Sequence, residues 1–140
     1  MKQVNEKELF DFCSSVKLDD LEKFHELKSN DGKLIIRMDP KSASLMKISK
    51  TTGILTLNPQ IKDFVHPFIT WVNLWGYLRL SYQNDFDADI RALEIMEKHS
   101  PLYADQLISD VILFFDRFQK PEIIQHNKER IKKMIEYLWR

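Results

Sequence analysis

The sequence predicts an α+β fold with an N-terminal helix, a small antiparallel sheet of about three strands and then three to four helices, one of them central and buried. Three observations predict it. Apolar residues recur at steps of three and four through the first 27 residues, short β-branched segments bounded by glycine and proline occupy residues 32–59, and helical periodicity returns after residue 61. The length of 140 residues suits one domain, so we expect a single domain over residues 1–140.

The first helix is predicted from about Glu6 to Leu27. Asn5 followed by Glu8 is typical of a capping box, in which two side chains satisfy free amide groups at the start of a helix. The segment Ser29-Asn30-Asp31-Gly32 then ends the helix, because these residues tolerate the backbone angles of a reversal.

The sheet is predicted from three short segments. Leu34–Met38 is β-branched and lies between Gly32 and Pro40, which indicates a strand. Leu45–Ser49 and Ile54–Leu57 flank a four-residue loop that ends in glycine, and this spacing is typical of a β-hairpin.

The remaining helices follow from apolar periodicity. The second half of the segment from Ile61 to Tyr82 is apolar over much of its circumference, which indicates a central buried helix. A second helix is expected over Phe86–His99, and a third ends near Lys120, because the residue before proline disfavours helix. The last helix, about residues 122–138, places four apolar residues on one face: Ile124, Ile131, Ile135 and Leu138.

Composition excludes several classes of protein. The longest apolar run, Phe68–Leu78, is interrupted by polar residues and is far shorter than the roughly 20 residues that span a bilayer, so no membrane segment is expected. No apolar leader follows the first residue, so we expect the chain to stay in the cytoplasm. Cys13 is the only cysteine, which excludes an internal disulfide and a multi-cysteine zinc site; we interpret it as a core residue.

Charge is balanced overall but uneven along the chain. Twenty-one basic and 21 acidic residues give zero net charge, and so no global field for nucleic acid. The segment 32–62 is basic, and a nucleic-acid-binding regulator that uses this block is one alternative; its basic residues are Lys33, Arg37, Lys41, Lys47, Lys50 and Lys62. The block lacks interleaved aromatic residues for base stacking, so the sequence favours association with protein.

Acidic residues offer a second alternative. Asp85, Asp87 and Asp89 alternate as in the start of a calcium loop, but Ile90 and Met96 stand where such a loop needs glycine and glutamate. We interpret the run as a helix N-terminus, where carboxylates meet free amide groups and the positive end of the dipole. A metal-dependent hydrolase or binder would use these three carboxylates, with His66 or His99 as a further ligand.

Three segments resemble elements of a known family. Thr52–Pro59 looks like its sheet-edge hairpin, Phe68-Ile69 looks like the start of its active-site helix, and Asp85–Asp89 looks like its Glu-x-x-Ala-Asp element. With the order of elements above, the chain resembles the minimal zincin domain of the ImmA/IrrE-like zinc endopeptidases of phages and mobile elements. The resemblance implies a zincin-like core over about residues 30–119, followed by the C-terminal helix at about 122–138.

The resemblance also implies that the catalytic centre is missing. Such enzymes carry H-E-x-x-H, whose imidazoles bind zinc and whose carboxylate takes a proton from the metal-bound water. The corresponding ligand and base positions here are Asn73, Leu74 and Tyr77, and Asp85 stands at the third-ligand position. An amide and a phenol are poor zinc ligands and Leu74 accepts no proton, so we expect no metal, no cofactor, no small-molecule substrate and no catalysis.

We therefore expect a non-catalytic component with a structural or protein-interaction role, either a virion part or a regulator in the cytoplasm. The partner would be another protein or a second copy of the chain. The last helix combines an apolar face with basic and aromatic side chains. The apolar face either packs on the core, as most amphipathic faces do, or lies in the groove of a partner. Its candidate contact residues are Lys128, Lys132, Lys133, Tyr137 and Trp139.

Overall fold

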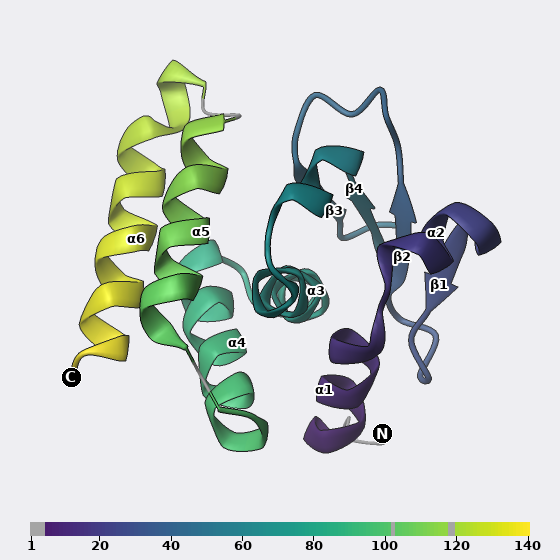
Figure 1. Ribbon diagram of the computed structural model, residues 1–140, viewed down its shortest axis with the longest axis horizontal. Coiled ribbons are helices and arrows are strands. Elements are labelled where there is room, and N and C mark those ends of the chain that lie inside the picture. The colour runs from purple at the N-terminus through teal and green to yellow at the C-terminus, as the bar shows by residue number, and fades with distance from the viewer. Residues whose placement is uncertain (1–4, 102, 118–119) are drawn as a thin grey trace.

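The computed structural model describes residues 5–101, 103–117 and 120–140 of the chain. It is an α+β fold in which a four-stranded sheet and a group of helices pack on opposite sides of one buried helix (Figure 1). The elements follow in the order α1 (Glu6–Ser15), α2 (Leu18–Phe24), β1 (Glu26–Lys28), β2 (Ile35–Met38), β3 (Met46–Ser49), β4 (Ile54–Leu57), a 3-10 turn (Pro59–Asp63), α3 (His66–Arg79), α4 (Asp85–His99), α5 (Ala104–Arg117), a second 3-10 turn (Pro121–Ile123) and α6 (Ile124–Leu138).

The N-terminal region differs from the single helix predicted over Glu6–Leu27. Asn5 caps α1 as expected, but the chain becomes extended at Val16 and Lys17 and a second short helix follows. The hydroxyl groups of Ser14 and Ser15 bond back to carbonyl groups in the preceding turn, which competes with continuation of the helix. The prediction was wrong here because the apolar spacing continues past the residue at which the helix ends. His25 has a left-handed backbone conformation and ends α2, and Leu27 lies in strand β1.

The sheet is also larger and differently connected than predicted. Its strand order is β1-β2-β4-β3, with antiparallel outer pairs and a parallel β2–β4 pair, so the sheet is mixed and not purely antiparallel. The predicted β3–β4 hairpin is confirmed, and Gly53 has the positive φ that its turn requires. The chain passes from β2 to β3 before it returns to form β4 between them, and Leu55 and Leu57 of this central strand are fully buried.

Helix α3 is the centre of the molecule, as the sequence predicted. Every residue from Phe68 to Leu78 is buried, and α3 packs against α1, α4, α5 and β3. Figure 1 views it nearly end-on, between the sheet and the C-terminal helices. Gly76 allows the close approach of α3 to β4, since a Cβ atom at this position would lie 2.8 Å from Leu55 Cδ2.

The C-terminal helices lie close to their predicted bounds. Helix α4 begins one residue before Phe86, with Asn84 as its cap, and α5 ends at Arg117. Residues 118 and 119, which the predicted third helix included, lie outside the described residues. In the described part of the chain, no helix combines the length and apolarity needed to cross a membrane.

Candidate functional site

The positions that correspond to zinc ligands in the resemblance are filled by buried side chains of α3. Leu74 is fully buried in the core. The Asn73 amide is also buried, and its Nδ2 donates to the carbonyl oxygen of Cys13 at 3.1 Å, which ties α3 to α1. This placement gives Asn73 a structural contact in the core.

Tyr77 faces a different partner. Its hydroxyl group donates to Asp31 Oδ2 at 2.5 Å, and Asp31 also accepts from the Ser29 hydroxyl group and the Lys33 amide in the turn before β2. Burial opposes ionisation of Asp31, but these hydrogen bonds and the Lys33 charge hold its pKa below the usual range. Burial and the same carboxylate raise the pKa of Tyr77. Tyr77 therefore fixes a turn and stays neutral.

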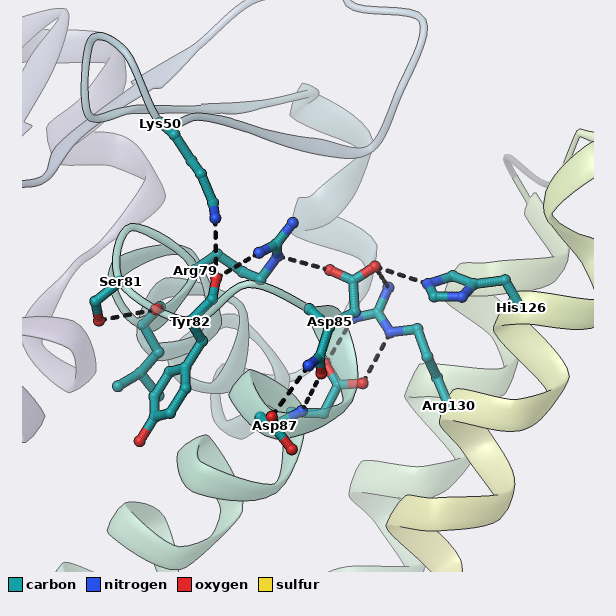
Figure 2. A network of polar contacts seen from close by, with 11 residues as sticks. Lys50, Arg79, Ser81, Tyr82, Asp85, Asp87, His126 and Arg130 are labelled. Atoms are coloured by element: carbon teal, nitrogen blue, oxygen red, sulfur yellow. Dashed lines mark hydrogen bonds and ion pairs between the residues drawn. The ribbon is translucent and has the colours of Figure 1, made fainter.

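Asp85 lies in a separate network at the start of α4. Figure 2 shows Arg79, His126 and Arg130 pointing toward its carboxylate. Arg79 Nε donates to Oδ1 at 2.9 Å, His126 Nε2 lies 2.8 Å from Oδ2, and Arg130 Nη1 lies 3.9 Å from Oδ2. Among the described residues, Asn73, Tyr77 and Asp85 thus have separate hydrogen-bond partners: Cys13 for Asn73, Asp31 for Tyr77, and Arg79 and His126 for Asp85.

The α3–α4 connection joins this network to the sheet. The carbonyl oxygen of Tyr82 accepts from Arg79 Nη1 at 2.6 Å and from Lys50 Nζ at 3.0 Å (Figure 2). Lys50 belongs to the β3–β4 turn, so one carbonyl group holds a lysine of the sheet and an arginine of α3 together. The network thereby connects the sheet, α3, α4 and α6.

A buried ion pair lies next to Asp85. Arg130 of α6 donates from Nε and Nη2 to the two oxygens of Asp89, at 2.8 and 2.7 Å, and both side chains are almost fully buried. The guanidinium group lies over the rings of Trp75 and Phe115, at 5.6 and 4.8 Å from their centroids. Sequence reasoning missed this pair, although Arg130 falls in helical phase with Asn127 and Met134, which form the inner face of α6.

The two carboxyl groups of this network are shifted in opposite directions. Burial opposes ionisation of Asp85, but Arg130, His126 and Arg79 outweigh it and lower its pKa. Asp89 is more deeply buried, and burial raises its pKa against the opposing attraction of Arg130. The fork of two hydrogen bonds from Arg130 is nevertheless the geometry of an ionised carboxylate.

The other residues of the metal alternative lie apart from one another. Asp87 bonds with Asn84 at the start of α4, His66 Nε2 lies 2.6 Å from the carbonyl oxygen of Ser14, and His99 contacts Glu6 and stacks on Phe10. Within the described ranges, no group of three or more histidine, cysteine, aspartate or glutamate side chains is arranged to hold a metal ion.

The basic block is spread over the sheet and its edges. Arg37 and Lys47 lie on either side of Thr56 in the strand register, on the exposed face, and Arg37 pairs with Glu26. Lys50 is bonded to the Tyr82 carbonyl group. The other members are exposed in turns and loops: Lys33, Lys41 and Lys62.

The predicted docking residues of α6 divide between two sides of the helix. Lys133 lies 5.4 Å from the centre of the Phe86 ring, and the Tyr137 hydroxyl group donates to Glu97, so both contact α4. Lys128, Lys132 and Trp139 are exposed, and Trp139 keeps 53% of its surface open.

The predicted apolar face of α6 is turned partly toward solvent. Asn127, Arg130 and Met134 point into the core, whereas Ile131 and Leu138 are half-buried and Ile135 is 38% exposed. Helix α5 shows the same feature, since Ile112 and Leu113 are exposed beside a fully apolar inner face. All large exposed apolar side chains of the described residues lie in the last 38 residues: Tyr103, Ile112, Leu113, Ile123, Ile135 and Trp139.

Comparison of the chain with models of protein families, with curated proteins and with solved structures finds no match.

Proposed function

We propose that this chain is a non-catalytic, zincin-like domain that acts as a structural or protein-interaction component, as a virion part or as a regulator. The docking surface is the outer face of the α5–α6 pair, which we define by Asp105, Ile112, Leu113 and Asp116 of α5 and by Lys128, Lys132, Ile135 and Trp139 at α6. The gathering of exposed apolar side chains on this one helical pair carries the proposal. Apolar side chains grouped on a surface are typical of association sites.

The interior supports a role without catalysis. Leu74 stands where a general base would be needed, and Asn73 and Tyr77 are hydrogen-bonded to Cys13 and Asp31. The carboxylates of Asp85 and Asp89 face arginine side chains, which supply the positive charge that a metal ion would otherwise provide. These groups stabilise the fold, and the proposed function of the domain therefore lies at its surface.

Site-specific photo-crosslinking tests the docking surface. A benzophenone amino acid is placed at Leu113 and, as a matched control, at the exposed Lys47 on the sheet, and the full chain is irradiated in the cells that express it. We expect a discrete protein adduct from position 113 and none of the same mass from position 47. Equal adducts from both positions, or none from 113, would contradict the proposal.

Metal analysis tests the absence of catalysis. We expect untagged protein purified without chelator to contain no stoichiometric zinc, and its thermal unfolding to be unchanged by EDTA, because a structural or catalytic metal would contribute to the folding free energy. Stoichiometric zinc together with a melting temperature that falls on chelation would overturn the non-catalytic assignment.

A further inference from the structure

A pocket of about 120 Å³ lies between the sheet and the C-terminal helices. Its walls are mostly apolar and come from β3, α3, α5 and the second 3-10 turn: Met46, Trp75, Phe114, Phe115 and Ile123. Ile123 is 37% exposed, and Ser44 beside it in the wall is half-buried, so the pocket opens to solvent on this side. Apolar walls with a few polar groups are typical of sites for small molecules.

One polar group of the wall has no hydrogen-bond partner. Trp75 is 6% exposed, and its buried indole Nε1 has no acceptor within hydrogen-bond distance in the described part of the chain. The indole of Trp71 differs, because its Nε1 donates to the carbonyl oxygen of Asp89 at 3.4 Å. An indole N–H group can only donate, and a buried donor without an acceptor is unfavourable. The pocket therefore favours a molecule with an oxygen that accepts from Trp75.

The charges beside the pocket favour a neutral molecule. Arg130 is part of the wall, but its Nε and Nη2 are bonded to Asp89 and its Nη1 lies 3.9 Å from Asp85 Oδ2. A carboxylate in the pocket would have to share this guanidinium group with two carboxylates of the chain, and a cation would lie beside Arg130. Burial of a charge without a partner of its own is costly.

The volume of the pocket sets the size of the molecule. An apolar cavity of about 150 Å³ holds one benzene molecule, so this pocket has room for about five or six non-hydrogen atoms. We propose that the pocket binds a small neutral carbonyl compound, a ketone or an amide, whose oxygen accepts a hydrogen bond from Trp75 Nε1. The residues that define the docking surface do not line the pocket, so this site is independent of the proposed function.

Nuclear magnetic resonance of the isotope-labelled full chain tests the proposal, because each of its three tryptophan side chains gives its own indole N–H signal. Cyclopentanone is the probe, and methylenecyclopentane, which has the same shape without the oxygen, is its control. We expect cyclopentanone to move the Trp75 indole proton downfield in a saturable way, with little change at Trp71 and at the exposed Trp139. The methyl signals of Met46 and Ile123 should show that methylenecyclopentane binds at least about fivefold more weakly, since it leaves the donor unpaired.

Variants locate the binding in this pocket. Ile123→Phe narrows the pocket at its open side and should abolish the shift, whereas Ile112→Phe, at an exposed isoleucine outside the pocket, should leave it unchanged. Trp75→Phe removes the donor and keeps an aromatic ring, so cyclopentanone should then bind no better than methylenecyclopentane. A Trp75 signal that does not respond to cyclopentanone, equal affinity of the wild type for both compounds, or a shift that survives Ile123→Phe overturns the proposal.

Discussion

At the scale of single residues, the pair of Asp89 and Arg130 carries the largest energetic consequence. The Asp89 side chain is 1% exposed and that of Arg130 is 6% exposed, so neither charge can return to water while the fold persists. A buried ion pair adds little net stability over an apolar pair of the same volume. Removal of one partner is nevertheless strongly destabilising, because the other charge then stays buried without compensation. The pair therefore fixes the position of α6 against α4.

Arg130→Met tests this dependence. The change leaves a buried carboxylate without its cation and should lower the free energy of unfolding by about 3–5 kcal/mol, as urea unfolding would measure. The double variant Asp89→Leu/Arg130→Met should regain most of that loss, because no charge remains buried. Arg117→Met, which removes an exposed pair with Asp63, is the control and should cost at most about 1 kcal/mol. If Arg130→Met is as stable as Arg117→Met, Asp89 does not depend on Arg130.

Asp85 gives a prediction for pH. The pKa of Asp85 is lower in the folded protein than in the unfolded chain. The carboxylate therefore stabilises the fold fully at pH values above its unfolded pKa, and this stabilisation is lost as the pH falls through its folded pKa. The difference in unfolding free energy between wild type and Asp85→Asn should therefore shrink from about pH 5 to about pH 3. Urea unfolding at several pH values measures it, with Asp87→Asn as a control at an exposed carboxylate. A difference that stays constant over this range would refute the assignment.

Residue burial was predictable where apolar character alone decides it. The sequence predicts Cys13 as a core residue, and it is fully buried, which raises the pKa of its thiol group. The burial of Asp89 is not predictable from the sequence, because its charge is compatible with the core only through Arg130, which lies 41 residues later in the sequence. Long-range pairing of polar groups leaves no local pattern, and this is why the network around Asp85 was missed.

At the scale of elements, sequence periodicity predicted the types of most elements but not their connections. The buried helix, the β3–β4 hairpin and the last helix follow from spacing and turn chemistry. The break at Val16, the strand β1 and the parallel β2–β4 pair do not, because spacing carries no information on where the backbone turns or which strand lies beside which. Spacing likewise does not show that Lys133 and Tyr137 of α6 contact α4.

The contact between α3 and β4 gives a prediction at this scale. Gly76→Ala should improve helix propensity by about 1 kcal/mol, yet its methyl group would meet the Leu55 side chain at 2.8 Å in a packed core. We expect a net loss of stability of about 1–2 kcal/mol in urea unfolding. Adding Leu55→Val removes one methylene group at the point of contact and should recover part of the loss. If Gly76→Ala stabilises the protein, α3 and β4 are not so closely packed.

At the scale of the whole molecule, α3 is the element on which both halves depend. The sheet contacts it through β3 and Leu55, the C-terminal helices contact it through α4 and α5, and α1 packs on it as well. The edge strand β1 has three residues and pairs on one side only, and α2 has seven residues. Opening β1 and α2 exposes little of the core, whereas opening α3 exposes nearly all of it.

Native-state hydrogen exchange should therefore separate these elements. Amide groups of residues 68–78 should exchange only through global unfolding, with a free energy equal to that from urea unfolding, because no smaller opening releases α3. Amide groups of α2 and β1 should exchange through openings of lower free energy that change little with denaturant. Exchange of α3 as fast as that of β1 would show that the sheet and the helices separate without global unfolding, and α3 would then be a hinge between two units.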